Sequence, residues 1–279
     1  MKSANKIRLT AAALSAAACL GTFSAHGAFA AYPERNAPEI TLDGDRYEGM
    51  ARLSEGVTYV KLREFSEGLG ATVTWNQETG TASIRKDGLS LTVGCSDDYV
   101  TANGYYLWFN GRTFVDGERI YIPLRAIGSV FGYDTKWDES SFAAKLSTGE
   151  KPSENKSYSE DDLYWLSRII SAEAEGESLD GKLAVGSVVL NRVKSPEFPN
   201  TVYGVIFDRK NGIQFTPVAN GTVYGEPDHE SILAARLCLE GSILNGDILF
   251  FMNASIAESF WISSSRRYVM TVGNHDFYA

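Results

Sequence analysis

An internal repeat in the middle of the chain constrains its fold more than any other sequence feature. Five residues recur at an offset of 62 positions within a window of 17 residues: Tyr59 and Tyr121, Leu62 and Leu124, Arg63 and Arg125, Gly70 and Gly132, Trp75 and Trp137. Each copy has the pattern of a short strand, a helix closed by glycine, and returning strands. Recurrence at one spacing indicates two similar units, and predicts an α+β module over residues 36–147.

The N-terminus has the features of an export signal. Basic residues precede an apolar stretch over residues 9–23, and Ala28-Phe29-Ala30 forms a small-residue cleavage site. The apolar run of about 15 residues is shorter than the roughly 20 that span a bilayer. We therefore expect residues 1–30 to be a signal peptide and the mature chain to be extracellular or in the cell wall. Cys19, after a run of small residues, offers the alternative of a lipoprotein anchor.

Composition limits the classes of function. The formal charge of −9 becomes −12 once residues 1–30 and their three basic side chains are removed. Such an acidic chain has no general attraction to nucleic acid or anionic lipid. The three histidines and three cysteines form neither an HExxH nor a CxxC motif, so the sequence predicts no metal and no cofactor. For Cys95 and Cys238, two buried and unpaired thiols fit better than a disulfide framework, although export permits a bridge.

A polar segment separates the repeat from a second domain. Residues 148–158 are rich in Gly, Pro and charge, which predicts a linker, with the second domain over 159–279. Ser159 begins a capping-box-like helix start, and apolar residues follow at helical spacing. Glu173 falls within that apolar stripe, whereas Glu175 points away and Gly176 is expected to end the helix.

A carboxyl on the buried face of a helix, close to the helix end, has the environment that a general acid needs. Burial disfavours the charged form, so Glu173 should keep its proton near neutral pH. The alternative is a structural carboxyl held by Arg192, Arg168 or a backbone amide. Glu175 is expected to be a solvated charge.

Several segments of the second domain resemble one known family. Ile170-Ser-Ala-Glu-Ala-Glu-Gly-Glu177, the run from Gly181 to Lys194, and Phe198-Pro-Asn-Thr-Val202 are similar to spore cortex-lytic enzyme (SleB-type) cell-wall hydrolases. Shorter matches follow in the same order at 214–218, 250–253 and 273–278. The resemblance implies a lysozyme-like, mainly helical catalytic domain with a small sheet. It also implies that Glu173 is the catalytic glutamate of the family's EARGE motif, with Glu175 in place of the usual arginine.

The resemblance further implies cleavage of the β-1,4 bond between N-acetylmuramic acid and N-acetylglucosamine in peptidoglycan glycan strands, by a lytic transglycosylase. A hydrolase is the alternative and would need a second carboxylate, for which Glu177, Asp180 and Asp228 are candidates. A noncatalytic wall-binding protein is the remaining hypothesis. The substrate, spore cortex in germination or vegetative wall, stays open, as does any further wall or spore-coat partner.

Weaker candidates for substrate binding lie elsewhere in this domain. They are Glu177, Gln214, Phe215, Thr216, Asn253 and His275. For the loop of Gln214 to Thr216 the alternative is a structural clamp. For His275 it is a hydrogen-bonded structural role, which we favour over proton transfer.

The repeat module resembles the N-terminal domain of copper amine oxidases, a stalk domain. Copper does not follow, because no histidine lies between residues 32 and 228. Its aromatic residues suit either glycan stacking or the pairing and packing of strands, and we favour the latter: Tyr99, Tyr105, Tyr106, Trp108 and Phe109.

Overall fold

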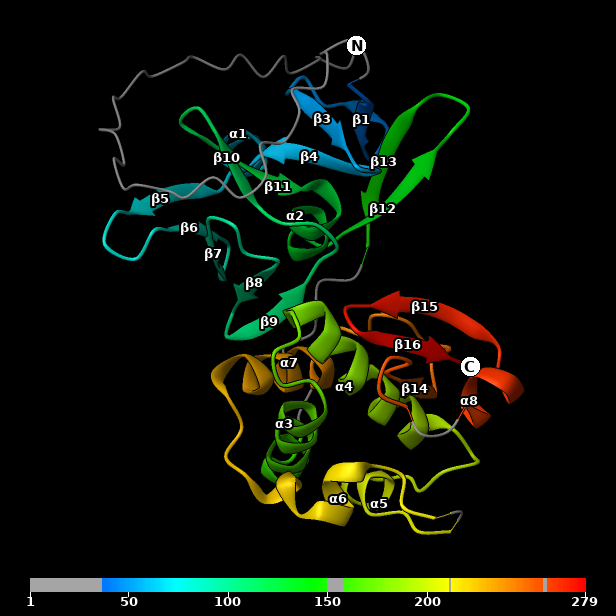
Figure 1. The fold of residues 1–279 in the computed structure, drawn as a ribbon. Coiled ribbons are helices and arrows are strands. Elements are labelled where there is room, and N and C mark those ends of the chain that lie inside the picture. The colour runs from blue at the N-terminus through cyan, green and yellow to red at the C-terminus, as the bar shows by residue number, and fades with distance from the viewer. Residues whose placement is uncertain (1–36, 150–157, 211, 258–259) are drawn as a thin grey trace, which may run out of the picture.

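The computed structural model describes residues 37–149, 158–210, 212–257 and 260–279. Figure 1 shows two lobes, an upper one built mainly of strands and a lower one built mainly of helices. The expected signal peptide, with Cys19, and most of the expected linker lie outside the described residues. Within the described ranges, no helix has the length and apolar character needed to cross a membrane.

The N-terminal lobe contains three sheets and two short helices. Its sheets have the strand orders β12-β13-β1-β2, β10-β11-β4-β3 and β5-β6-β7-β8-β9. The elements are β1 (Glu39–Leu42), β2 (Asp45–Arg46), β3 (Ala51–Ser54), β4 (Val57–Lys61), α1 (Leu62–Gly68), β5 (Thr72–Asn76), β6 (Thr81–Lys86), β7 (Leu89–Gly94), β8 (Tyr99–Ala102), β9 (Tyr105–Trp108), β10 (Phe114–Asp116), β11 (Arg119–Pro123), α2 (Leu124–Val130), β12 (Tyr133–Asp138) and β13 (Ala143–Thr148).

The two copies of the repeat fold into the same order of elements. The segment β4-α1-β5-β6 corresponds to β11-α2-β12-β13, and each helix is followed by a glycine with φ near +80°, Gly70 or Gly132. Strands β4 and β11 pair antiparallel, with Val60 opposite Ile122. These two residues are equivalent in the repeat, since they lie 62 positions apart. A local pseudo-two-fold axis therefore passes between them, and both side chains are fully buried.

The C-terminal lobe is mainly helical with one three-stranded sheet, so the α+β class predicted from the sequence is confirmed. The sheet has the order β14-β16-β15. The elements are α3 (Glu160–Glu173), α4 (Leu179–Lys194), α5 (Val202–Ile206), α6 (Thr216–Asn220), the 3-10 helix η2 (Thr222–Tyr224), α7 (His229–Leu239), β14 (Phe250–Met252), α8 (Trp261–Ser265), β15 (Tyr268–Val272) and β16 (His275–Tyr278).

Helix α4 is the centre of this lobe and packs against both α3 and α7. Its residues Leu183, Ala184, Val185, Val188 and Val189 are all fully buried. The close approach depends on Gly186, because a methyl group there would lie 2.7 Å from Cys238 Sγ of α7 and 3.0 Å from Ile170 Cδ1 of α3. Cys238 is a free, buried thiol, so it does not pair with Cys95.

The two lobes meet where β9 contacts the C-terminal end of α7, and Figure 1 shows them side by side. The backbone N–H of Tyr106 donates to the Glu240 carboxylate, and that of Trp108 donates to Ser242 Oγ at 3.1 Å. The indole of Trp108 donates to Asp180 Oδ1 at 3.2 Å. Tyr99, Tyr106 and Trp108 also pack against the core of the C-terminal lobe. The sequence favoured a role in the pairing and packing of strands, and β8 and β9 do pair Tyr99 with Trp108. Packing between the lobes is a further role that the sequence did not predict.

Gly186→Ala should destabilise the protein by about 1–3 kcal/mol. Alanine favours a helix by roughly 1 kcal/mol over glycine, but the added methyl group overlaps Cys238 Sγ. Replacing Cys238 with alanine in the same chain should restore part of the loss. Urea unfolding midpoints of the wild type and the single and double variants measure this. Equal midpoints for wild type and Gly186→Ala would contradict the packing described.

Candidate active site

Helix α3 places Glu173 at its C-terminal end. Ser159 and Asp162 form the capping box that starts this helix, as the sequence predicts. The predicted helix end at Gly176 is wrong, because α3 ends at Glu173. The chain leaves the helix at Ala174, whose methyl group is 1% exposed and whose carbonyl accepts from the backbone N–H of Glu177 at 3.1 Å. Packing of Ala174 into the core thus turns the chain before the glycine.

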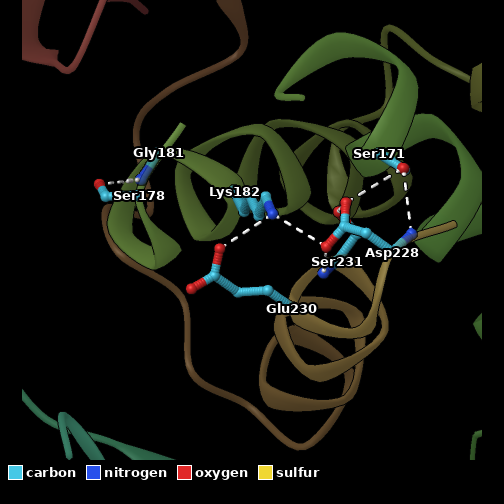
Figure 2. A network of polar contacts seen from close by, with 7 residues as sticks. All are labelled: Ser171, Ser178, Gly181, Lys182, Asp228, Glu230 and Ser231. Atoms are coloured by element: carbon cyan, nitrogen blue, oxygen red, sulfur yellow. Dashed lines mark hydrogen bonds and ion pairs between the residues drawn. The ribbon is translucent and has the colours of Figure 1, made fainter. Parts of the chain in front are cut away.

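A polar network holds the last turn of α3 against α4 and α7. Figure 2 shows Lys182 of α4 between the carboxylates of Asp228 and Glu230, with 2.9 Å to each. Asp228 caps α7, accepting from the backbone N–H of Ser231 at 2.8 Å, and also accepts from Ser171 Oγ at 3.2 Å. Ser171 lies two residues before Glu173. The network therefore fixes the helix end that carries the carboxyl.

The Glu173 carboxyl is half-buried, and a large fraction of it stays protonated up to neutral pH. Burial raises its pKa from the ordinary 4.5 to about 7, and the positive charge of Arg192 opposes that rise. Within the described residues it forms neither a hydrogen bond nor an ion pair, and Arg168 instead pairs with Glu226 at 2.9 Å. Among the described residues, Glu173 therefore lacks the close partner that a purely structural carboxyl would need.

Arg192, near the end of α4, is the charged neighbour of Glu173. Its guanidinium lies 4.8–5.3 Å from the ring centres of Phe198, Phe215 and Phe250, and its Nε donates to the carbonyl of Leu249 at 2.7 Å. Burial lowers its pKa to about 10. We call these three rings the aromatic box. The aromatic box holds the Arg192 cation near Glu173, and the cation limits the rise of the Glu173 pKa without cancelling it.

Glu177 holds a turn of the chain, and its side chain is only 8% exposed. One carboxylate oxygen accepts from Asn274 Nδ2 at 2.8 Å, and the other accepts from the Asn274 backbone N–H at 3.4 Å. This approach requires a glycine at 273, because a methyl group there would lie 1.9 Å from Glu177 Oε2. The loop between α3 and α4 is thereby tied to the turn between β15 and β16.

His275 lies on the same buried wall. Its Nδ1 is 3.6 Å from Glu177 Oε1, and its ring packs edge-on against Phe251 with centres 5.5 Å apart. Burial lowers the pKa of His275, while the charges of Glu177 and Asp276 oppose that effect. A lowered pKa favours the neutral imidazole at pH 7. Its buried Nδ1 has no hydrogen-bond partner among the described residues, so the structure shows ring packing and not the hydrogen-bonded structural role favoured from the sequence.

The loop before α6 contributes one buried and two accessible candidates. Phe215 is 2% exposed and supports Arg192, so its ring does not offer the direct substrate contact expected from the sequence. Gln214 is half-buried and donates from Nε2 to the carbonyl of Gly212 at 3.2 Å. Thr216 is exposed at the start of α6. A ring contact between Phe215 and Phe251 connects this loop with the wall that carries His275.

Asn253 closes a turn after β14. Its Oδ1 accepts from the backbone N–H of Ser255 at 3.0 Å and from Ser255 Oγ at 2.6 Å. The side chain is half-buried, so part of it stays accessible beside the strand. The geometry thus gives Asn253 a structural contact in addition to the binding role expected for it.

The three candidates for a second carboxylate are all engaged elsewhere. Glu177 holds Asn274, Asp180 accepts from the indole of Trp108, and Asp228 caps α7. Partial burial raises the pKa of Asp228, but hydrogen bonds from Ser231 and Lys182 outweigh burial and hold that pKa below its usual value. As for metals, the described ranges contain no cluster of three or more His, Cys, Asp or Glu side chains able to hold an ion.

Comparison with known proteins assigns both lobes. Residues 176–278 match the Cell Wall Hydrolase family, and residues 41–145 match the copper amine oxidase N-terminal domain. The C-terminal domain belongs to the cell wall hydrolase family. The matched range begins three residues after Glu173, so the role of Glu173 rests on its position and environment.

Curated relatives of the cell wall hydrolase domain include two spore cortex-lytic enzymes. That of Oceanobacillus iheyensis is 36% identical over 132 residues, 47% of this chain and 46% of the relative. That of Bacillus cereus is 33% identical over 159 residues, 51% of this chain and 60% of the relative. The chain thus spans about half the length of these relatives. The solved catalytic domain of the germination-specific lytic transglycosylase SleB from Bacillus anthracis is 35% identical, with 45% of this chain and 99% of that chain covered and a TM-score of 0.41.

Sequence reasoning missed the partners that position the predicted residues. Lys182 carries no local signal, since a lysine early in a helix usually faces solvent, yet it is 4% exposed here. Asn274 lies in the matched segment 273–278, but nothing in the sequence indicated that it binds Glu177. The Gly273-Asn274 pair is the sequence signal that could have indicated a tight turn at this position.

Glu173→Gln should stabilise the cell wall hydrolase domain at high pH. The folded-state pKa of about 7 exceeds the ordinary 4.5, so the wild type loses stability as pH rises from 4.5 through 7. The amide has no such loss. At pH 8 the variant should be more stable by about 1–3 kcal/mol, and at pH 4 it should match the wild type. Urea unfolding at both pH values, with the exposed Glu175→Gln as control, measures this. A constant difference across pH would contradict a raised pKa.

Gly273→Ala should destabilise the domain by about 2–4 kcal/mol. The residue has φ of +56°, which strains an alanine, and the methyl group would displace the Glu177 carboxylate. Gly221→Ala is the matched control, because Gly221 also has a positive φ, +84°, but nothing lies within 4 Å of a methyl group there. Thermal unfolding of the two variants compares them, and similar losses would show that the Glu177 contact is not what Gly273 preserves.

Proposed function

We propose that the mature chain is an exported enzyme that cleaves peptidoglycan glycan strands between N-acetylmuramic acid and N-acetylglucosamine, as a lytic transglycosylase. The observation that carries the proposal is the Glu173 carboxyl, half-buried at the end of α3 with a pKa of about 7. Such a group is protonated in a large fraction of molecules at neutral pH and can donate to a leaving group. Membership of the C-terminal domain in the cell wall hydrolases supports the substrate class.

In the proposed reaction one carboxyl acts twice. Protonated Glu173 donates its proton to the glycosidic oxygen while the bond from that oxygen to C1 of the muramic acid breaks and positive charge develops at C1. The carboxylate that results then takes the proton of the C6 hydroxyl of the same sugar. The C6 oxygen attacks C1, which closes a 1,6-anhydro ring and returns Glu173 to its protonated form. No water is consumed.

The other candidate carboxylates already form structural hydrogen bonds, which favours the transglycosylase reaction over hydrolysis. An inverting hydrolase needs a second carboxylate that positions water, and a retaining one needs a carboxylate nucleophile. Glu177, Asp180 and Asp228 each hold a structural partner instead. A transglycosylase needs no second carboxylate, because its nucleophile belongs to the substrate.

For the wall material, we propose spore cortex, since the curated relatives are named as spore cortex-lytic enzymes. The repeat module would then act as a stalk that holds the hydrolase domain at the wall. Export would use residues 1–30 as a signal peptide. The alternative is a lipoprotein anchored through Cys19, which would also place the chain outside the cell.

Muropeptide mass spectrometry of sacculi and spore cortex treated with residues 31–279 tests the reaction. We expect soluble products one water lighter than those with reducing ends, and loss of at least about 100-fold in rate with Glu173→Gln. Above pH 7 the rate should fall about tenfold per pH unit, because the acid loses its proton. Glu175→Gln is the matched control and should keep the wild-type rate.

Other product masses would overturn parts of this proposal. Full-mass reducing ends would make the enzyme a hydrolase and require another carboxylate. An absence of soluble fragments from both substrates, with binding retained, would leave a noncatalytic wall-binding protein. Release from sacculi alone would replace spore cortex with vegetative wall as the substrate.

A further inference from the structure

Five aromatic side chains gather on the surface of the cell wall hydrolase domain, outside the site built around Glu173. They come from α3, α5 with the residue after it, and η2: Tyr164, Trp165, Tyr203, Phe207 and Tyr224. Trp165 is the hub, with ring centres 4.9–6.1 Å from the other four. We call these five residues the aromatic platform.

The three tyrosines leave much of their surface in solvent. Tyr164 is 45% exposed, Tyr203 is 49% exposed and Tyr224 is 61% exposed. Trp165 and Phe207 lie half-buried beneath them and pack on the domain core. Contiguous exposed aromatic surface of this kind marks a ligand or partner site rather than ordinary surface. Each tyrosine ring contacts Trp165, which lowers the cost of ordering the side chains when a ligand binds.

Polar groups border the platform. The Arg168 guanidinium lies 3.7 Å from the centre of the Tyr164 ring and donates to Glu226 at 2.9 Å. Arg168 is 8% exposed, and its Nε is buried with no hydrogen-bond partner among the described residues. The Glu226 side chain is 88% exposed and offers acceptors to a ligand. A surface that combines ring faces, phenol hydroxyls and a carboxylate matches a sugar ring, whose C–H face packs on aromatics while its hydroxyls form hydrogen bonds.

The aromatic platform lies near the candidate active site. Helix α3 carries Trp165 near its start and Glu173 at its end, about 12 Å apart along the axis at 1.5 Å per residue. Phe207 precedes Asp208. Burial lowers the pKa of Arg192, the cation beside Glu173, and the charge of Asp208 opposes that lowering. On the other side, η2 follows α6, which begins at Thr216. A glycan strand bound at Glu173 therefore has the platform within reach of its neighbouring sugars.

We propose that the aromatic platform is an accessory subsite that stacks N-acetylated sugar rings of the glycan strand away from the cleaved bond, chiefly on Tyr203 and Tyr224. The choice of glycan rests on the proposed function. The subsite strengthens binding of long strands and takes no part in proton transfer. Removing its rings therefore weakens substrate binding and raises KM, while kcat stays unchanged.

Binding is tested in residues 31–279 carrying Glu173→Gln, with a β-1,4-linked N-acetylglucosamine hexamer as the probe and calorimetry as the measurement. Tyr203→Ala with Tyr224→Ala should weaken Kd about tenfold, which corresponds to ~1.4 kcal/mol. Replacing both with phenylalanine should restore most of the affinity, because the ring faces are kept and only the phenol hydroxyls are lost. Tyr268→Ala is the matched control, a tyrosine 54% exposed on β15, and should bind as the parent does.

Measurements of enzyme activity distinguish a failure of the platform proposal from a failure of the proposed function. In the chain with Glu173 intact, the double alanine variant should raise KM about tenfold on glycan strands and keep kcat within about twofold. If the wild type cleaves sacculi while the variant keeps its hexamer affinity, the platform proposal is overturned and the proposed function stands. If nothing is cleaved but hexamer binding depends on the rings, the platform stands and the proposed function fails.

A protein contact is the other use of such a surface. Light scattering of the wild type and the double alanine variant measures it directly. A wild-type dimer that the substitutions dissociate, with no change in hexamer affinity, would make the platform a self-association surface and overturn the proposal.

Discussion

The half-burial of one carboxyl, Glu173, is the constraint on which the chemistry of the candidate active site depends. Removing a carboxylate from water is costly, so the group stays neutral unless a partner neutralises it. Arg192 is near enough to Glu173 to limit the rise of the Glu173 pKa, and its guanidinium packs among the aromatic rings without forming an ion pair with Glu173. The network of Lys182, Asp228 and Ser171 holds the helix end in place. The carboxyl therefore stays at the half-buried position that raises its pKa.

The sequence predicted features that depend on local spacing. The capping box at Ser159 and the apolar stripe of α3 come from neighbouring residues, and the structure has both. The end of α3 was misplaced because it is decided by packing of Ala174, which no local pattern encodes. The aromatic box of Arg192 joins residues 198, 215 and 250, and a single sequence does not reveal that they meet. Tertiary contacts, rather than propensities, set those positions.

The difference between local patterns and tertiary contacts also explains why Glu177 and Phe215, expected to bind substrate, make structural contacts instead. Both lie in segments that suggest a binding loop, and polar or aromatic type alone does not say which way a side chain faces. Glu177 is drawn inward by a glycine turn almost 100 positions away, and Phe215 by a buried guanidinium. The aromatic platform is the reverse case, since its rings have the composition of a core and yet three of them face solvent.

The pairing of Val60 with Ile122 has a consequence for the origin of the repeat module. A strand that pairs antiparallel with its own equivalent is self-complementary, as in the isologous contact of a two-fold dimer. A shorter ancestral chain with a single copy would have been able to form the same contact with a second molecule. Duplication and fusion would then have turned an association that depends on concentration into one that is permanent.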